Sequence, residues 1–276
     1  MGTLGHFRIK KLNQMPINQA AAQAVQQMQF RATDHLLLLR SELFSGLPAD
    51  TLMLVLQQSV RKRAEGKEPL IRQSESNHQV YFILSGGVKV SSTAHDGKEL
   101  ISDVLGACDI FGEMSALHDR PAHASIIALV PSIFMVMDKA NFMGLISTHS
   151  EMAVRLLRIF AGRIERKDGF ISDLIFADAG SRLAKRLLAV ASVPVYQGVN
   201  HDRLSTIPAD RRNHQHQSIV IKISQQDLAN MVGVSRESVN KQLRVWEREG
   251  MLTLSAGHID IHSPDRLAVL ALRRET

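Results

Sequence analysis

A cluster of charged residues lies in the segment SQQDLANMVGVSRESVNKQL, residues 224–243. Arg236, Glu237 and Lys241 fall within the first turn and a half of a predicted helix, and Asn240 shares the face of Arg236. An Arg or Lys side chain can bridge O6 and N7 of guanine, and a Glu carboxylate can accept a hydrogen bond from N4 of cytosine. The spacing therefore predicts that this helix reads base edges in the major groove of double-stranded DNA.

The residues around this cluster predict a helix-turn-helix. Ser224 is a suitable cap for a helix over residues 225–232, and Gly233 can end that helix and turn the chain. Ser235 then caps a second helix, whose inward side carries Val239, Leu243 and Trp246. In such a unit the second helix enters the major groove, and its N-terminal residues contact the bases.

A second feature follows the predicted recognition helix. That helix ends near Gly250, and the segment MLTLSAGHIDIHS then predicts two short strands around Ala256 and Gly257, which would form a β-wing. His258 in the wing is placed to contact a phosphate. The predicted DNA-binding residues are Ser224, Ser235, Arg236, Glu237, Asn240, Lys241 and His258.

Composition agrees with an acidic polymer as partner. The chain has 276 residues, of which 33 are Lys or Arg and 27 are Asp or Glu, and its formal net charge is +6. The single cysteine, Cys108, excludes a disulfide within the chain and a four-cysteine zinc or iron–sulfur site. The first residues, MGTLGHFRIKKLNQ, lack the apolar stretch of a signal peptide, and no apolar run is long enough to cross a membrane. We expect a cytoplasmic protein that does not bind membranes.

The hydrophobic period divides the chain into parts. Residues 1–33 are rich in Gln and Ala and predict a frayed or loosely docked helical extension, and residues 36–60 have helical spacing. Between about residues 69 and 137, short apolar runs such as QVYFIL and SIFMVMD alternate with glycine turns, which predicts an antiparallel β-roll. Residues 192–218 form a polar linker. Its histidines, His201, His214 and His216, are interpreted as part of a solvated loop and not as a metal site.

Residues 141–176 contain no proline and have apolar positions at every third or fourth residue, which predicts one long helix. A helix that extends beyond its own domain often packs against a second copy of itself, so we expect a homodimer. The predicted dimer interface consists of Met152, Leu156, Ile159, Phe160, Ile164 and Ile171.

The chain resembles the Crp/Fnr transcription regulators from about residue 36 to residue 272. The resemblance rests on LFSGLP, YFILSGGVKV, DIFGEMSALHDRP, RLAKRLL and SRESVNKQLRVWEREGML. It implies an α+β fold with an N-terminal β-roll sensor (36–140) after an extension (1–35), a long dimerisation helix (141–177) and a C-terminal winged helix-turn-helix (178–276). It also implies a palindromic DNA site and RNA polymerase as a partner. The recognition helix of the best-known branch usually has Arg where this chain has Lys241.

The resemblance also indicates a ligand pocket, in which this chain departs from the members that bind cAMP. Their Gly-Glu pair is present as Gly112 and Glu113, but the Arg that pairs with the cyclic phosphate, and the hydroxyl residue after it, are replaced by His123 and Ala124. Lys167 and Asp168 stand in place of the Thr-Ser pair that meets the adenine, and Arg120 is a candidate substitute for the missing Arg. The predicted pocket residues are Gly112, Glu113, Met114, Ser115, His123, Ala124, Ser125, Lys167 and Asp168.

Three interpretations of the sensor follow from these replacements. The roll binds another small ligand such as a different nucleotide, binds none, or still binds cAMP weakly; no cofactor beyond a small nucleotide effector is indicated. A metal-dependent β-roll enzyme is the remaining alternative, with Glu113, His118 and His123 as ligands. Such enzymes typically have a His-x-His pair, which the roll lacks, so the sequence predicts a regulator and not an enzyme.

Overall fold

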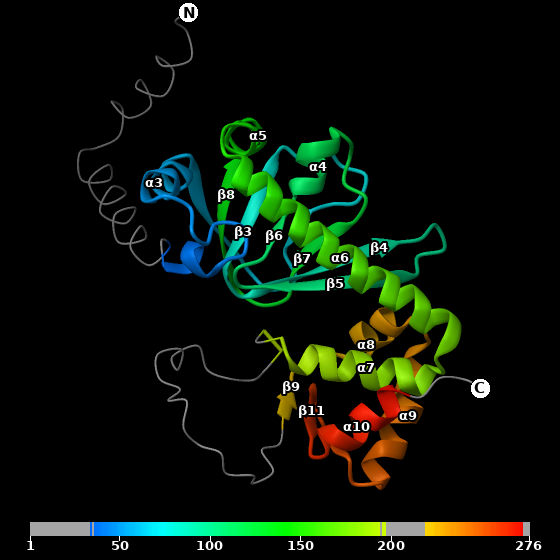
Figure 1. Cartoon of the computed structure of the whole chain (residues 1–276). Helices are drawn as coiled ribbons and strands as arrows, with labels where there is room; N and C mark the ends of the chain where they lie inside the picture. The colour runs from blue at the N-terminus through cyan, green and yellow to red at the C-terminus, as the bar shows by residue number, and fades with distance from the viewer. Residues whose placement is uncertain (1–33, 35, 194, 197–218, 273–276) are drawn as a thin grey trace, which may run out of the picture.

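The protein has two folded parts that are joined by a long helix, α6 (Ser150–Phe176) (Figure 1). The structure, a computed structural model, describes residues 34, 36–193, 195–196 and 219–272. Figure 1 shows α6 running across the β-roll and down to the C-terminal domain. The expected residue 1–33 extension and the histidines of the linker lie outside the described residues. No helix in the described part of the chain is long and apolar enough to cross a bilayer.

Two four-stranded antiparallel sheets form the N-terminal roll. One has the strand order β1-β8-β3-β6 and the other β2-β7-β4-β5. The first sheet contains β1 (Ser59–Ala64), β8 (Ser132–Asp138), β3 (Gln79–Ser85) and β6 (Ile110–Phe111). The second contains β2 (Pro69–Ile71), β7 (Ser125–Ala128), β4 (Gly87–Thr93) and β5 (Glu99–Gly106). The predicted β-roll is confirmed.

Strand β3 shows why this sequence folds as a central strand. Side chains alternate between the two faces of a strand, and both faces of β3 are buried. Tyr81 and Ile83 pack between the two sheets, whereas Phe82 and Leu84 pack on the outer side, against helices. The helices on that outer side are α3 (Ala49–Gln57), α5 (Lys139–Thr148) and the first turns of α6.

Two predictions of the secondary structure were wrong. The expected helix over residues 141–176 is divided into α5 and α6 at His149, which has the non-helical angles φ −124° and ψ 85°. Thr148 Oγ1 donates to the carbonyl of Gly144 at 2.8 Å, a contact of the kind that slightly destabilises and bends a helix. Residues 59 and 60 were assigned to a helical segment, but they begin the edge strand β1, which pairs with β8.

The C-terminal domain begins with α7 (Ala179–Ala191), which is followed by β9 (Ile219–Ile221), α8 (Gln225–Val232) and α9 (Arg236–Arg248). It ends with β10 (Leu252–Ser255), β11 (His258–Ile261) and α10 (Pro264–Ala271). The last two strands join β9 in a three-stranded sheet with the order β10-β11-β9. One apolar core unites these elements, with Leu187, Leu228 and Trp246 among its buried members. This core positions α9 relative to the wing.

Candidate functional site

The helix-turn-helix forms at the residues that the sequence indicated. Helix α8 begins after Ser224, whose Oγ accepts a hydrogen bond from the amide of Asp227 at 3.0 Å. Gly233 ends α8 in the left-handed conformation with φ +76°, which glycine adopts at little cost. Ser235 caps α9 by accepting from the amide of Ser238 at 3.1 Å. The predicted helix over 225–232 and both caps are confirmed.

Helix α9 is sharply two-sided. Val239, Leu243 and Trp246 are buried in the domain core and hold the helix in place. The opposite side carries the predicted base-reading residues, which are all exposed: Arg236, Glu237, Asn240 and Lys241. Among the described residues, neither Arg236 nor Lys241 forms an ion pair, so no neighbouring carboxylate neutralises either charge.

The β10–β11 wing and Ser224, the N-cap of α8, carry the remaining predicted DNA contacts of this domain. The antiparallel pair β10 and β11 turns at Ala256 and Gly257, as predicted. The half-buried His258 places Nδ1 at 3.0 Å from the carbonyl oxygen of Ala256, which leaves Nε2 as its outer polar atom. Ser224 is exposed, but its hydroxyl also donates to Asp227 Oδ2 at 2.6 Å. The role of Ser224 is thus first to cap α8.

A cavity of about 450 Å³ opens in the roll, beside α6 and the short helix α4 (Glu113–His118). Most of its wall is apolar, including Val90, Leu105, Phe111 and Phe160. Seven of the predicted pocket residues line it, namely Gly112, Glu113, Met114, Ser115, His123, Ala124 and Lys167.

Two predicted pocket residues do not line the cavity. The side chain of Ser125 is used within the roll, because its Oγ accepts a hydrogen bond from the amide of Gln73 at 3.0 Å. Asp168 is exposed on α6 and is absent from the cavity wall, whereas its neighbour Lys167 contributes to it. Arg120, the candidate substitute for the missing Arg, is exposed and does not line the cavity either.

A buried ion pair forms the polar centre of the cavity. Nη1 of Arg163, from α6, lies 2.6 Å from Oε1 of Glu113, and its Nη2 donates to the carbonyl of Ile110. Burial raises the pKa of Glu113, while the positive charge of Arg163 opposes that rise. Oε2 of Glu113 makes no hydrogen bond to any other described residue. The cavity therefore offers one buried carboxylate oxygen to a ligand donor.

Arg163 is the pocket residue that sequence reasoning missed. The helical period predicts an inward-facing residue at position 163 or 164, and the apolar Ile164 was the predicted one. Only the fold brings Arg163 to Glu113, across 50 residues of sequence. The sequence signal was a charged residue on the inward stripe of an otherwise apolar helix face, since such a residue requires a partner.

The missing phosphate-binding Arg is not replaced by a charged His123 at neutral pH. Burial, followed by the nearby positive charge of Lys167, lowers the pKa of His123 below its ordinary value. His123, His118 and Glu113 all line the cavity. Within the described residues, however, no group of three His, Cys, Asp or Glu side chains is arranged to hold a metal ion.

The predicted dimer residues of α6 separate into three groups by burial. Met152 and Leu156 were wrongly assigned, because both are buried in the core of the roll beside α3 and α5. Ile159 and Phe160 are half-buried against that same core. Ile164 and Ile171 are exposed. The side of α6 that carries Met152 and Leu156 therefore belongs to the core of the protomer, and another side, which carries Leu157, Ile164 and Ile171, presents an apolar surface.

Comparisons with known proteins identify both domains. Residues 61–149 match the cyclic nucleotide-binding domain, and residues 181–270 match the Crp-like helix-turn-helix domain. A "CRP-like cAMP-activated global transcriptional regulator" of Mycobacterium tuberculosis is 28% identical over 232 residues, which cover 84% of this chain and 97% of that protein. The chain belongs to the Crp/Fnr family of transcription regulators.

Other relatives agree with this assignment. The "Cyclic AMP receptor protein" of Thermus thermophilus is 26% identical over 231 residues, or 84% of this chain and 97% of that protein. The c-di-GMP-responsive global regulator of Xanthomonas campestris has the same fold, with a TM-score of 0.63, 20% identity and coverage of 78% of this chain and 99% of that chain. This Crp/Fnr protein is thus a DNA-binding transcription regulator and not an enzyme.

Gly112 is the N-cap residue of α4 and forms part of the cavity wall, where only glycine fits. Its φ is +84°, and an added Cβ would lie 2.5 Å from the carbonyl oxygen of Gln79. We expect Gly112→Ala to destabilise the protein by more than the roughly 1–3 kcal/mol that a strained backbone alone costs. Gly97→Ala is the matched control, because Gly97 has φ +82° but open space around its Cβ. Thermal unfolding followed by circular dichroism measures the stability of both variants. Equal losses of stability would contradict the prediction and show that the backbone around Gly112 shifts to accommodate the added Cβ.

Proposed function

We propose that this regulator acts in the cytoplasm as a homodimer on a palindromic DNA site and presents its promoters to RNA polymerase. The observation that supports this most directly is the exposed N-terminal face of α9, where Arg236, Glu237 and Lys241 form no ion pair with any other described residue. Family membership supports RNA polymerase as the partner. The two copies of α9 would enter successive major grooves, about 34 Å apart.

Each of the three residues has a distinct role in this proposal. Arg236 lies in the first turn of α9, where its planar fork can bridge O6 and N7 of one guanine. Glu237 accepts from cytosine N4 and repels phosphate, so it contributes discrimination more than affinity. Lys241 supplies a point charge in place of an Arg fork, so its base preference is looser.

The base-reading role of Arg236 predicts a loss of specificity. Arg236→Ala should weaken binding to the preferred operator by about 1–3 kcal/mol and relax the preference at one guanine. Arg248→Ala is the control, because Arg248 is an exposed arginine at the far end of the same helix. Fluorescence anisotropy on the operator and on randomised duplexes measures both variants. An Arg236→Ala protein that loses affinity equally for all duplexes would identify Arg236 as a phosphate contact.

The dimer is supported by the exposed stripe of α6. Leu157, Ile164 and Ile171 are spaced seven residues apart and are 66%, 58% and 54% exposed. A seven-residue apolar repeat on a helix is typical of a coiled-coil seam. Ile164 also lines the ligand cavity, so a partner helix on this stripe would lie beside the cavity opening. A second copy of the chain is therefore the proposed occupant.

Charges placed in this stripe should separate the protomers. Leu157→Glu with Ile171→Glu should yield monomers, and operator binding should fall steeply because one protomer contacts only one half-site. Val269→Glu is the control, since Val269 is 62% exposed on α10 and lies off the stripe. Analytical ultracentrifugation measures the mass. A wild-type protein that sediments as a monomer at tens of micromolar would contradict the proposal.

We further propose that the cavity binds a small, anionic effector, such as a nucleotide, and binds cAMP only weakly at neutral pH. The Mycobacterium tuberculosis relative is named as cAMP-activated, but in this chain His123 stands where the resemblance to cAMP-binding family members leads us to expect the phosphate-binding Arg. The cavity retains Glu113, whose Oε2 is available to a ligand hydroxyl. Lys167 and a protonated His123 are the groups that would face an anion at the cavity wall.

The lowered pKa of His123 sets the pH dependence of anion binding. An anion favours the imidazolium form, so affinity for cAMP should be low at about pH 8 and should rise as the pH falls below the ordinary value of about 6.5. The gain is limited to about tenfold for each unit by which the ligand raises the pKa of His123. His123→Arg with Ala124→Ser should bind more tightly at all pH values.

Isothermal titration with cAMP at both ends of this pH range is the measurement. His123→Gln should remove the pH dependence, whereas the control His118→Gln should retain it, because His118 lines the same cavity without replacing the phosphate-binding Arg. Tight cAMP binding by the wild-type protein at about pH 8 would contradict the proposal. That result would indicate that Arg163 leaves Glu113 and pairs with the phosphate.

A further inference from the structure

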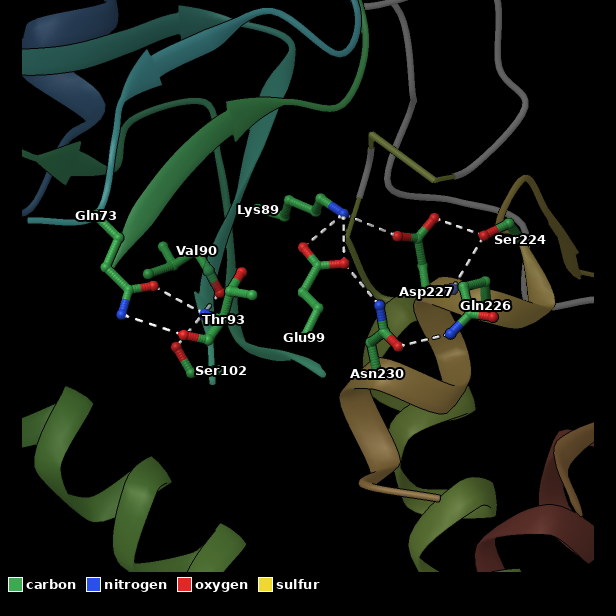
Figure 2. Close-up of polar contacts among 10 residues, drawn as sticks. All are labelled: Gln73, Lys89, Val90, Thr93, Glu99, Ser102, Ser224, Gln226, Asp227 and Asn230. Atoms are coloured by element: carbon green, nitrogen blue, oxygen red, sulfur yellow. Dashed lines mark hydrogen bonds and ion pairs between the residues drawn. The ribbon is translucent and has the colours of Figure 1, made fainter. Parts of the chain in front are cut away.

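The two domains are joined by a cluster of charges that spans 138 residues of sequence (Figure 2). Nζ of Lys89, on β4, lies 3.0 Å from Glu99 Oε1 on β5 and 3.1 Å from Asp227 Oδ1 on α8. Asn230 of α8 donates to Oε2 of the same Glu99 at 2.6 Å. The sensor hairpin β4–β5 is thereby bonded to the first helix of the helix-turn-helix.

This cluster is only partly accessible to water. The side chains of Lys89, Glu99 and Asp227 are 15%, 25% and 28% exposed, respectively. Burial lowers the pKa of Lys89, but hydrogen bonds and charges from Glu99 and Asp227 together raise it above its ordinary value. Lys89 is therefore cationic at physiological pH, and its charge holds the two carboxylates together.

Apolar packing accompanies the charges. Ile101, two residues after Glu99 on β5, is 1% exposed and belongs to the apolar core of the DNA-binding domain. Residues two apart on a strand share a face, so Glu99 and Ile101 both face that domain. The contact is thus a packed interface and not an isolated surface ion pair.

The other face of the hairpin borders the ligand cavity. Val90, next to Lys89, lines the cavity, as does Ser102, next to Ile101. The opposite wall is connected as well: Ser125 follows Ala124 of the cavity and accepts from the amide of Gln73. The side chain of Gln73 in turn exchanges hydrogen bonds with the backbone of Thr93, at the end of β4 (Figure 2). Both walls of the cavity are thus connected to the hairpin.

The tip of the hairpin lies beside the recognition helix. A cleft of about 1080 Å³ is bounded on one side by the turn that carries Asp96 and Gly97, and on the other by Ser235 and Arg236. Asp96 and Glu99 thus place carboxylates on the side of the cleft opposite Arg236. Phosphates that approach the start of α9 in this arrangement would meet both the hairpin and its negative charges.

We propose that Lys89, Glu99, Asp227 and Asn230 form an interdomain latch, which holds the DNA-binding domain against the β4–β5 hairpin and keeps the start of α9 from DNA until the sensor releases it. The proposal rests on the proposed role of α9 as the DNA reader. The described arrangement is the closed state. Ligand binding or contact with DNA opens the latch by moving the hairpin away from α8.

The latch has a direct test, because removal of its central cation should open it. Without Lys89, the carboxylates of Glu99 and Asp227 face each other without a neutralising charge. Lys89→Gln should therefore raise the affinity of ligand-free protein for its operator by about 5- to 150-fold, the usual range of allosteric coupling, although the protein loses a positive charge. Lys98→Gln is the matched control: Lys98 lies on the same hairpin, 86% exposed, and pairs only with Asp96 among the described residues.

Fluorescence anisotropy on an operator selected from random duplexes by the full-length wild-type protein measures affinity. Hydrogen exchange of β5 and α8 in the absence of DNA measures opening, and it should increase in Lys89→Gln alone. Equal affinities in Lys89→Gln and Lys98→Gln, or equal exchange, would overturn the latch. A failure of the proposed base reading can be distinguished from a failure of the latch. In that case Arg236→Ala would keep the operator preference of the wild-type protein, while hydrogen exchange of β5 and α8 would still increase in Lys89→Gln alone.

A second variant closes the latch covalently. Glu99→Cys with Asn230→Cys in a Cys108→Ala background removes the free native thiol and leaves two thiols across the interface. A short bismaleimide linker should abolish operator binding by this protein, whereas the unlinked form should bind at least as well as the wild type. The Cys108→Ala parent treated with the same linker should be unaffected. A linked protein that binds the operator as well as its unlinked form would overturn the proposal.

Discussion

The ion pair between Arg163 and Glu113 ties the long helix α6 to the ligand cavity. A buried charge is tolerated only when its partner is present, because removal of one member of the pair leaves the other desolvated and unpaired and destabilises the fold. Glu113 is almost fully buried, and burial raises its pKa, so its ionised form depends on Arg163. The position of α6, and hence of everything that follows it in the chain, depends on contacts that a ligand in the cavity would disturb.

Much of the fold could be predicted because its elements have strong local signals. Strands β3 and β8 are apolar runs between turns, and α8 and α9 each begin at a serine cap. Strand β1, with the sequence SVRKRA, has no such pattern, because it is an edge strand with one largely exposed face. The break at His149 was missed because neither proline nor glycine marks it in the sequence.

The exposed face of α9 could be derived from sequence because it lies on one short helix, where spacing fixes direction. The cavity and the dimer stripe could not be derived in this way. The period of α6 predicted one apolar stripe, but the helix has two: Met152 and Leu156 pack into the roll, whereas Leu157 and Ile171 face outward. Periodicity gives the angular positions of residues but not which neighbour each side will meet. Likewise, the partners of Arg163 and Lys89 are fixed by tertiary contacts between distant segments.

The two faces of the β4–β5 hairpin also constrain how this regulator can diversify. Val90 lines the cavity and Lys89, the next residue, contacts the DNA-binding domain. A substitution that reshapes the cavity for a new effector shifts the strand that carries the interdomain contact. Under the proposed latch, effector preference and DNA binding without effector are inherited together, and a biosensor derived from this protein would require compensating changes on α8 to remain silent without its inducer.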